Sequence, residues 1–89
     1  MQIHVHPTLV QLRFYEEGVD VDKPLYKMET SYRGVANVVI DDLGTARVSL
    51  LHCNDFAKED YEEVIRICKH LQANKMIYRH NGQEHELCL

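Results

Sequence analysis

Apolar and polar residues alternate most regularly at the C-terminal end of the chain, where the pattern predicts a β-hairpin over residues 76–89. Asn81-Gly82 favours a tight type I′ turn, because both central positions of that turn need a positive φ. With the turn placed there, Met76 faces Leu87, and the opposite charges of Arg79 and Glu84 face each other. The hairpin therefore has one mainly apolar face and one charged face.

A second hairpin is predicted for residues 34–41 and 45–52, around the loop Asp42-Leu43-Gly44. A three-residue loop with Gly44 in the left-handed region pairs apolar residues of the two strands on one face. The six residues of that face are Ala36, Val38, Ile40, Ala46, Val48 and Leu50. A four-residue loop would set Val38 opposite Arg47 and mix the faces, so the register favours the three-residue loop.

Between the two hairpins the apolar residues recur at helical spacing and predict one long amphipathic helix. Asn54 or Asp55 is the expected N-cap, and Asn74 is the expected left-handed stop. At ~1.5 Å per residue the helix would be roughly 27 Å long, enough to cross several strands. Its predicted apolar face consists of Phe56, Ala57, Tyr61, Val64, Ile65, Cys68 and Leu71.

The first third of the chain is less regular. Residues 3–6 and 9–15 alternate like one strand that Pro7 interrupts, while residues 19–32 leave open either a loop or a short strand at 25–28. The predicted order is β–(β)–β–β–α–β–β in a single domain over residues 1–89. This is an α+β fold, with an antiparallel sheet of four to five strands and one long amphipathic helix packed on one face.

Composition and charge narrow the classes of protein. With 45% hydrophobic and 27% charged residues the chain reads as soluble and globular, and no apolar run approaches the ~20 residues that span a membrane. The start lacks the features of a secretory signal, and three cysteines without CxxC spacing indicate a reducing, cytoplasmic location. A net charge of −4 with scattered basic residues makes nucleic acid an unexpected partner.

Six histidines raise the question of a metal site. His4 and His6 lie two apart on a predicted strand, and His80 and His85 lie on facing strands. No three or four ligands show recognisable spacing, so surface histidines explain the pattern better than a metal centre. We therefore assign neither a metal ligand nor a cofactor.

Cys53 is the best candidate nucleophile, because it follows His52 and precedes the predicted helix, whose dipole favours a thiolate. Adjacent residues of an extended segment point in opposite directions, however, so His52 is poorly placed as its base. A strand–helix–strand order also invites comparison with the acetyltransferase core, where a glycine-rich turn at the helix start cradles a pyrophosphate. Residues 52–56 contain no glycine and put Asp55 at that position, so we assign no family and no catalytic residue.

Two surfaces remain as candidate binding sites. Val35, Val39 and Leu51 are predicted on the sheet face away from the helix, where residues 19–32, a second subunit or a partner must cover them. Acidic residues, among them Glu59, Asp60 and Glu84, are expected near one end of the domain.

These surfaces predict a small non-enzymatic protein–protein interaction module: an adaptor, inhibitor or regulator that binds a basic surface or a strand edge of its partner. The size is typical of accessory proteins of bacteria and their viruses, including phages. A homodimer formed through sheet edges is a further expectation, because only Glu84 and Glu86 protect the last strand. The alternative function is a small metal- or thiol-dependent enzyme or binder that uses His52 and Cys53.

Overall fold

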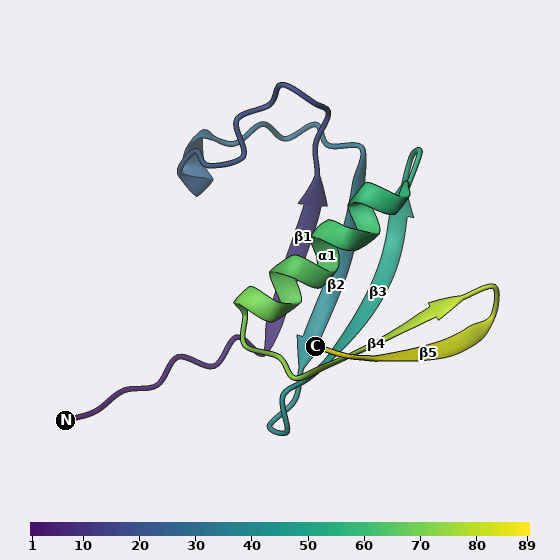
Figure 1. Cartoon of the computed structure of the whole chain (residues 1–89). Coiled ribbons are helices and arrows are strands. Elements are labelled where there is room, and N and C mark those ends of the chain that lie inside the picture. The colour runs from purple at the N-terminus through teal and green to yellow at the C-terminus, as the bar shows by residue number, and fades with distance from the viewer.

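The computed structural model describes residues 1–89 and shows a five-stranded sheet with one helix packed on one face (Figure 1). The strands follow one another across the sheet in chain order. The predicted α+β fold with a single helix is confirmed. The elements are β1 Leu9–Phe14, the short 3₁₀ helix η1 Leu25–Lys27, β2 Gly34–Ile40, β3 Thr45–Cys53, α1 Lys58–His70, β4 Lys75–His80 and β5 Gln83–Cys88.

The register predicted for the β4–β5 hairpin is confirmed, and that of the β2–β3 hairpin is confirmed from Ala36 to Ile40; beyond Ala36 a one-residue shift pairs Val35 with His52. Val38 faces Val48 across β2 and β3, and Arg79 faces Glu84 across β4 and β5. The sheet is mixed rather than wholly antiparallel, because β3 and β4 run parallel. A helix that connects the two strands carries the chain back to the end where β3 began, so the next strand starts in the same direction.

Residues 3–6 do not form the predicted strand. Strand β2 ends at Ile40, whose N–H binds the carbonyl of Thr8, and beyond that point no strand lies alongside the chain. A side-chain contact, His6 Nε2 to the carbonyl oxygen of Ile40 at 3.2 Å, holds residue 6. Residues 25–28 likewise contain no strand; the turn of η1 occupies them.

The helix begins later and ends earlier than predicted. Asp55 has a φ of 56°, which prevents the helix from starting at residue 54 or 55. The carboxylate of Asp60 instead accepts a hydrogen bond from the N–H of Ala57 at 2.9 Å, so the first turn is capped from within. Gln72, with a φ of 67°, takes the left-handed position predicted for Asn74.

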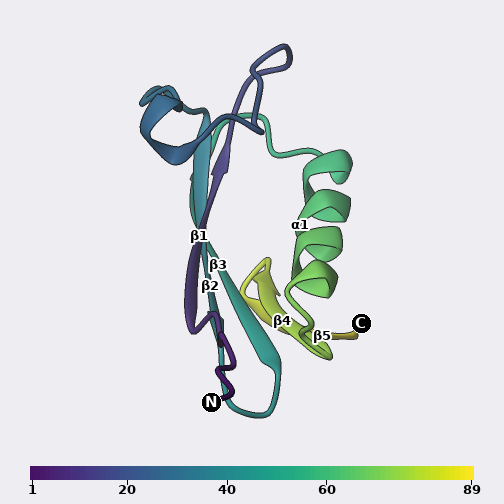
Figure 2. The ribbon, with the colours of Figure 1, turned by 90° about the vertical axis from the view of Figure 1, so that its left-hand side faces the viewer.

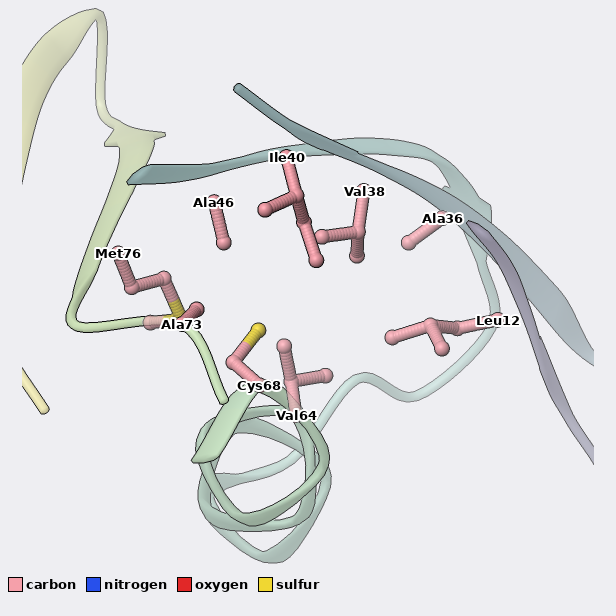
Figure 3. Packing of buried hydrophobic residues seen from close by; sticks show 9 residues of the cluster. All are labelled: Leu12, Ala36, Val38, Ile40, Ala46, Val64, Cys68, Ala73 and Met76. Atoms are coloured by element: carbon pink, nitrogen blue, oxygen red, sulfur yellow. The ribbon is translucent and has the colours of Figure 1, made fainter. Parts of the chain in front are cut away.

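The core lies between α1 and the sheet (Figure 3). Val64 and Cys68 are the two fully enclosed residues of the helix, and they point at the apolar face of the strands. Small and medium side chains dominate this layer. The buried apolar residues are Leu12, Ala36, Val38, Ile40, Ala46, Val64, Cys68, Ala73 and Met76.

The other face of the sheet carries no α-helix. The segment containing η1 lies on this side, across the sheet from α1 (Figure 2), and is joined to the strands by a hydrogen bond from Tyr15 Oη to the Glu29 carbonyl at 2.9 Å. Val35 is half-buried there, whereas Val39 stays 45% exposed and Leu51 59%. No helix of the structure is long and apolar enough to cross a membrane.

Candidate functional site: the cleft between β3 and β4

Strands β3 and β4 separate soon after they meet. They pair only over Thr45–Arg47 and Lys75–Ile77. Beyond these residues β3 continues over Val48–Cys53 and β4 over Tyr78–His80, each paired on its other side alone. Figure 1 shows the β4–β5 hairpin turning away from β3 at this point. We call the space between the two diverging strands the cleft.

Side-chain contacts join the β4–β5 hairpin to the helix. Tyr61 on α1 donates a hydrogen bond to the hydroxyl of Tyr78 on β4 at 2.8 Å, and the two rings meet edge to face. The ring of Tyr78 stacks in turn on His85 of β5, with centroids 5.3 Å apart. A register shift next to Val35 also perturbs the pairing of β2 with the end of β3, and such bulges bend and twist a strand.

On the helix side, the cleft opens into an apolar hollow of about 140 Å³. Leu50 and Phe56 line it while 47% and 41% exposed, which is high for large apolar side chains beside a core. Phe56 packs edge to face on Phe14, with ring centroids 6.0 Å apart. The other lining residues include Val48, Tyr61, Tyr78, Arg79 and His80.

On the opposite side, the same gap opens into a second and more polar hollow of about 380 Å³. Four residues, Val48, Leu50, Tyr78 and Arg79, line both hollows, so the cleft passes from one face of the sheet to the other. The residues that line only the second hollow are Arg47, Ser49, Ile77 and Glu84.

The two tyrosines supply a hydrogen-bond donor in the cleft. Burial and the hydrogen bond to Tyr78 raise the pKa of Tyr61 to about 12, so its hydroxyl stays protonated at neutral pH. The single bond between the hydroxyls uses one of their two hydrogens. No protein group accepts the hydrogen of Tyr78, which is therefore free for a bound ligand.

Arg33 links the start of α1 to the sheet. Its guanidinium forms an ion pair with Asp60 and donates to the Asn54 carbonyl at 3.3 Å and to Cys53 Sγ at 3.3 Å. The hydrogen bond from Arg33 holds the pKa of Asp60 below its usual value. Because Asp60 also caps the helix, the first turn presents a carboxylate where an acetyltransferase would hold a phosphate.

The contacts of Cys53 do not favour a reactive thiol. Burial raises its pKa above the usual value, and this outweighs the opposite effect of Arg33. His52 is exposed and forms no hydrogen bond with Cys53, as the extended backbone predicts. No group of three or more His, Cys, Asp or Glu side chains is placed to hold a metal ion.

The residues predicted for partner binding lie apart from one another. Glu59 is exposed on α1, Glu84 lines the polar hollow, and Asp60 is already paired with Arg33. Val39 and Leu51 are exposed on other parts of the sheet. Sequence reasoning missed the cleft, because Leu50, Tyr61 and Tyr78 have the spacing of ordinary core residues.

No protein-family model, curated protein or solved structure matches this chain. The geometry of the cleft is therefore the basis for assigning a function.

Proposed function

We propose that this protein is a small non-enzymatic binding module that accepts one extended segment of a partner protein in the cleft. The observation that carries the proposal is the break in pairing after Arg47 and Ile77. Alternate residues of Val48–Cys53 direct backbone N–H and C=O groups into the cleft, where no strand binds them. An extended segment supplies the missing partners, as in other complexes formed by strand addition.

The size of the apolar hollow supports a single anchoring side chain. Sites for drug-sized ligands and cofactors enclose about 300–1,000 Å³. The apolar hollow holds only about 140 Å³, close to the about 150 Å³ of an engineered cavity that binds benzene. One leucine, isoleucine or phenylalanine side chain matches this volume, and the free hydrogen of Tyr78 can bind a carbonyl oxygen of the same segment.

The cleft offers more to such a segment than the outer edges of the sheet do. Strands β1 and β5 each present one unpaired edge, and β5 carries Glu84 and Glu86. The cleft presents backbone from β3 on one side and from β4 on the other, with apolar walls on the helix side. The strand-edge partner is therefore favoured over the basic surface, since Asp60 is neutralised by Arg33.

We further propose that the protein works in the cytoplasm as an adaptor, inhibitor or regulator. Three cysteines without a disulfide bond support the cytoplasm. An adaptor, inhibitor or regulator needs only this binding step, and the raised pKa of Cys53 gives the thiol-dependent alternative no support.

Selection from a library of displayed unstructured peptides tests the proposal. We expect enriched peptides to share one large apolar residue flanked by residues that favour strands. The substitution Leu50→Lys places a charge in the cleft and should weaken their binding at least about tenfold, which corresponds to about 1.4 kcal/mol. Leu43→Lys is the matched control, because Leu43 is 81% exposed in the β2–β3 turn.

Two results would contradict the proposal. One is the absence of any enriched peptide. The other is binding that Leu50→Lys leaves unchanged, because the peptide would then occupy a different surface.

A further inference from the structure

The segment Met1–Val5, which we call the arm, has the pattern of a strand but no strand beside it. Ile3 and Val5 are 79% and 81% exposed, and they alternate with the polar residues Gln2 and His4. The arm leaves the sheet at β1 and points away from β4 and β5 (Figure 1). An extended backbone with exposed apolar side chains on one side is a strand without a sheet.

The cleft lacks a strand between β3 and β4, and the arm is a strand-like segment without a partner. It has unpaired backbone along Val48–Cys53, an apolar hollow on one side and a polar hollow on the other. A strand laid in the cleft sends alternate side chains to the two sides. Ile3 and Val5 would both lie on the helix side, where one of them fills the apolar hollow, while His4 would face the polar hollow that Glu84 lines.

We infer that, when no partner is bound, the arm of a second copy of this chain occupies the cleft. This inference rests on the proposed function, because the arm uses the same cleft as the partner segment. The arm is then a self-ligand that covers the apolar hollow and that a partner must displace.

The arm of the same copy cannot take this place. From β1 the cleft lies beyond β2 and β3, or about 14 Å away at the ~4.8 Å spacing of strands. Val5 and Ile3 lie one and three residues from His6, which is held by Ile40, so at about 3.3–3.6 Å per residue they reach at most about 4 Å and 11 Å from it. Neither residue of the same copy can therefore pair with β3 in the cleft.

A mixing experiment with two complementary variants tests the inference. Ile3→Asp/Val5→Asp disables the arm and keeps the cleft, whereas Leu50→Lys blocks the cleft and keeps the arm. The wild-type protein should self-associate with rising concentration in light scattering, and each variant alone should stay at the monomer mass of 10.4 kDa. A mixture of the two should form a complex of one chain of each, because it contains one working arm and one working cleft.

Two further variants control for the change of charge. Leu25 and Leu43 are 94% and 81% exposed and lie outside both the arm and the cleft. Leu25→Asp and Leu43→Lys should associate like the wild type.

Three outcomes would overturn the inference: a wild-type protein that is monomeric up to about 1 mM, association that survives Leu50→Lys, or a mixture that stays monomeric. The variant Ile3→Asp/Val5→Asp distinguishes a failure of this inference from a failure of the proposed function. If Ile3→Asp/Val5→Asp binds the selected peptides but the wild type never self-associates, the cleft is a partner site and the arm is not its ligand. If arm exchange occurs and no peptide is selected, the cleft serves self-association alone.

Discussion

Tyr61 on α1 and Tyr78 on β4 share a hydrogen bond of 2.8 Å between their hydroxyls, at the point where β4 has left β3. The bond joins the β4–β5 hairpin to the helix beside the cleft, and it leaves one hydroxyl hydrogen without an acceptor. The same pair of residues therefore helps to hold the cleft open and presents a donor to whatever enters it.

Tyr61→Phe should lower the free energy of unfolding by about 0.5–1.5 kcal/mol, the usual net value of one hydrogen bond. Urea denaturation followed by circular dichroism measures this change. Tyr78→Phe should cost a similar amount and should also weaken peptide binding, because it removes the donor nearest the ligand. Peptide affinity that is unchanged in Tyr78→Phe would mean that the free hydrogen of Tyr78 takes no part in binding.

Asp60→Asn should destabilise the protein at pH 7 by about 1–3 kcal/mol, since it removes the ion pair with Arg33 and weakens the helix cap. Because the folded-state pKa of Asp60 is lowered, this contribution is complete above the unfolded pKa of ~3.9. It is lost as the pH falls through the lower folded value.

The difference between the wild type and Asp60→Asn should therefore shrink below about pH 4 in acid titrations of stability. Glu59→Gln is the matched control, because Glu59 is exposed on the same turn and forms no ion pair. A difference that stays constant from pH 7 to pH 2 would contradict the role given to the Asp60 carboxylate.

Thiol labelling at pH 7 should reach the cysteines in the order of their exposure. Cys88 is exposed, Cys53 is half-buried with a raised pKa, and Cys68 is buried with a raised pKa. We expect Cys88 to react first and Cys68 only on unfolding. Mass spectrometry of timed samples gives the order. A Cys53 that reacts faster than Cys88 would revive the alternative of a thiol-dependent activity.

Gly34→Ala should be destabilising, because Gly34 lies opposite Cys53 and an added Cβ would come within 2.6 Å of Sγ and 2.7 Å of Cα. The added Cβ would clash with the backbone of Cys53 as well as with its side chain. Strands β2 and β3 must therefore move apart, which lowers the free energy of unfolding by about 1–3 kcal/mol. Cys53→Ala should not rescue the variant, whereas Cys53→Gly should restore part of its stability. Equal rescue by both substitutions would place the clash at the sulfur alone.

The parts of the fold that follow from local patterns were predictable. Alternation and turn chemistry around Gly44 and Asn81-Gly82 determine the hairpin registers next to the turns, because these depend on a few neighbouring residues, whereas the shift beside Val35 was not predicted. The helix boundaries were not predictable, since its first turn depends on Asp60 pairing with Arg33, a residue 27 positions away.

The cleft depends on contacts between residues that are far apart in the sequence. The alternation of apolar and polar residues does not indicate such contacts. Tyr78 has the spacing of a core residue, and its spacing does not indicate that strand pairing ends at Ile77 or that Tyr78 contacts Tyr61 on the helix. The parallel direction of β4 likewise depends on where the helix ends. The predicted acidic surface lost Asp60 for the same reason, because a distant arginine took its charge.

Amide hydrogen exchange measured by NMR, with and without a peptide from the selection, shows whether the partner segment binds between β3 and β4. The Ile3→Asp/Val5→Asp variant is the protein to use, because its cleft should be free. Peptide binding should slow exchange at alternate amides of Val48–Cys53 and at Tyr78–His80, because their unpaired groups gain a strand partner. Protection that appears only along β1 or the outer edge of β5 would contradict this prediction and place the ligand at a sheet edge instead of between β3 and β4.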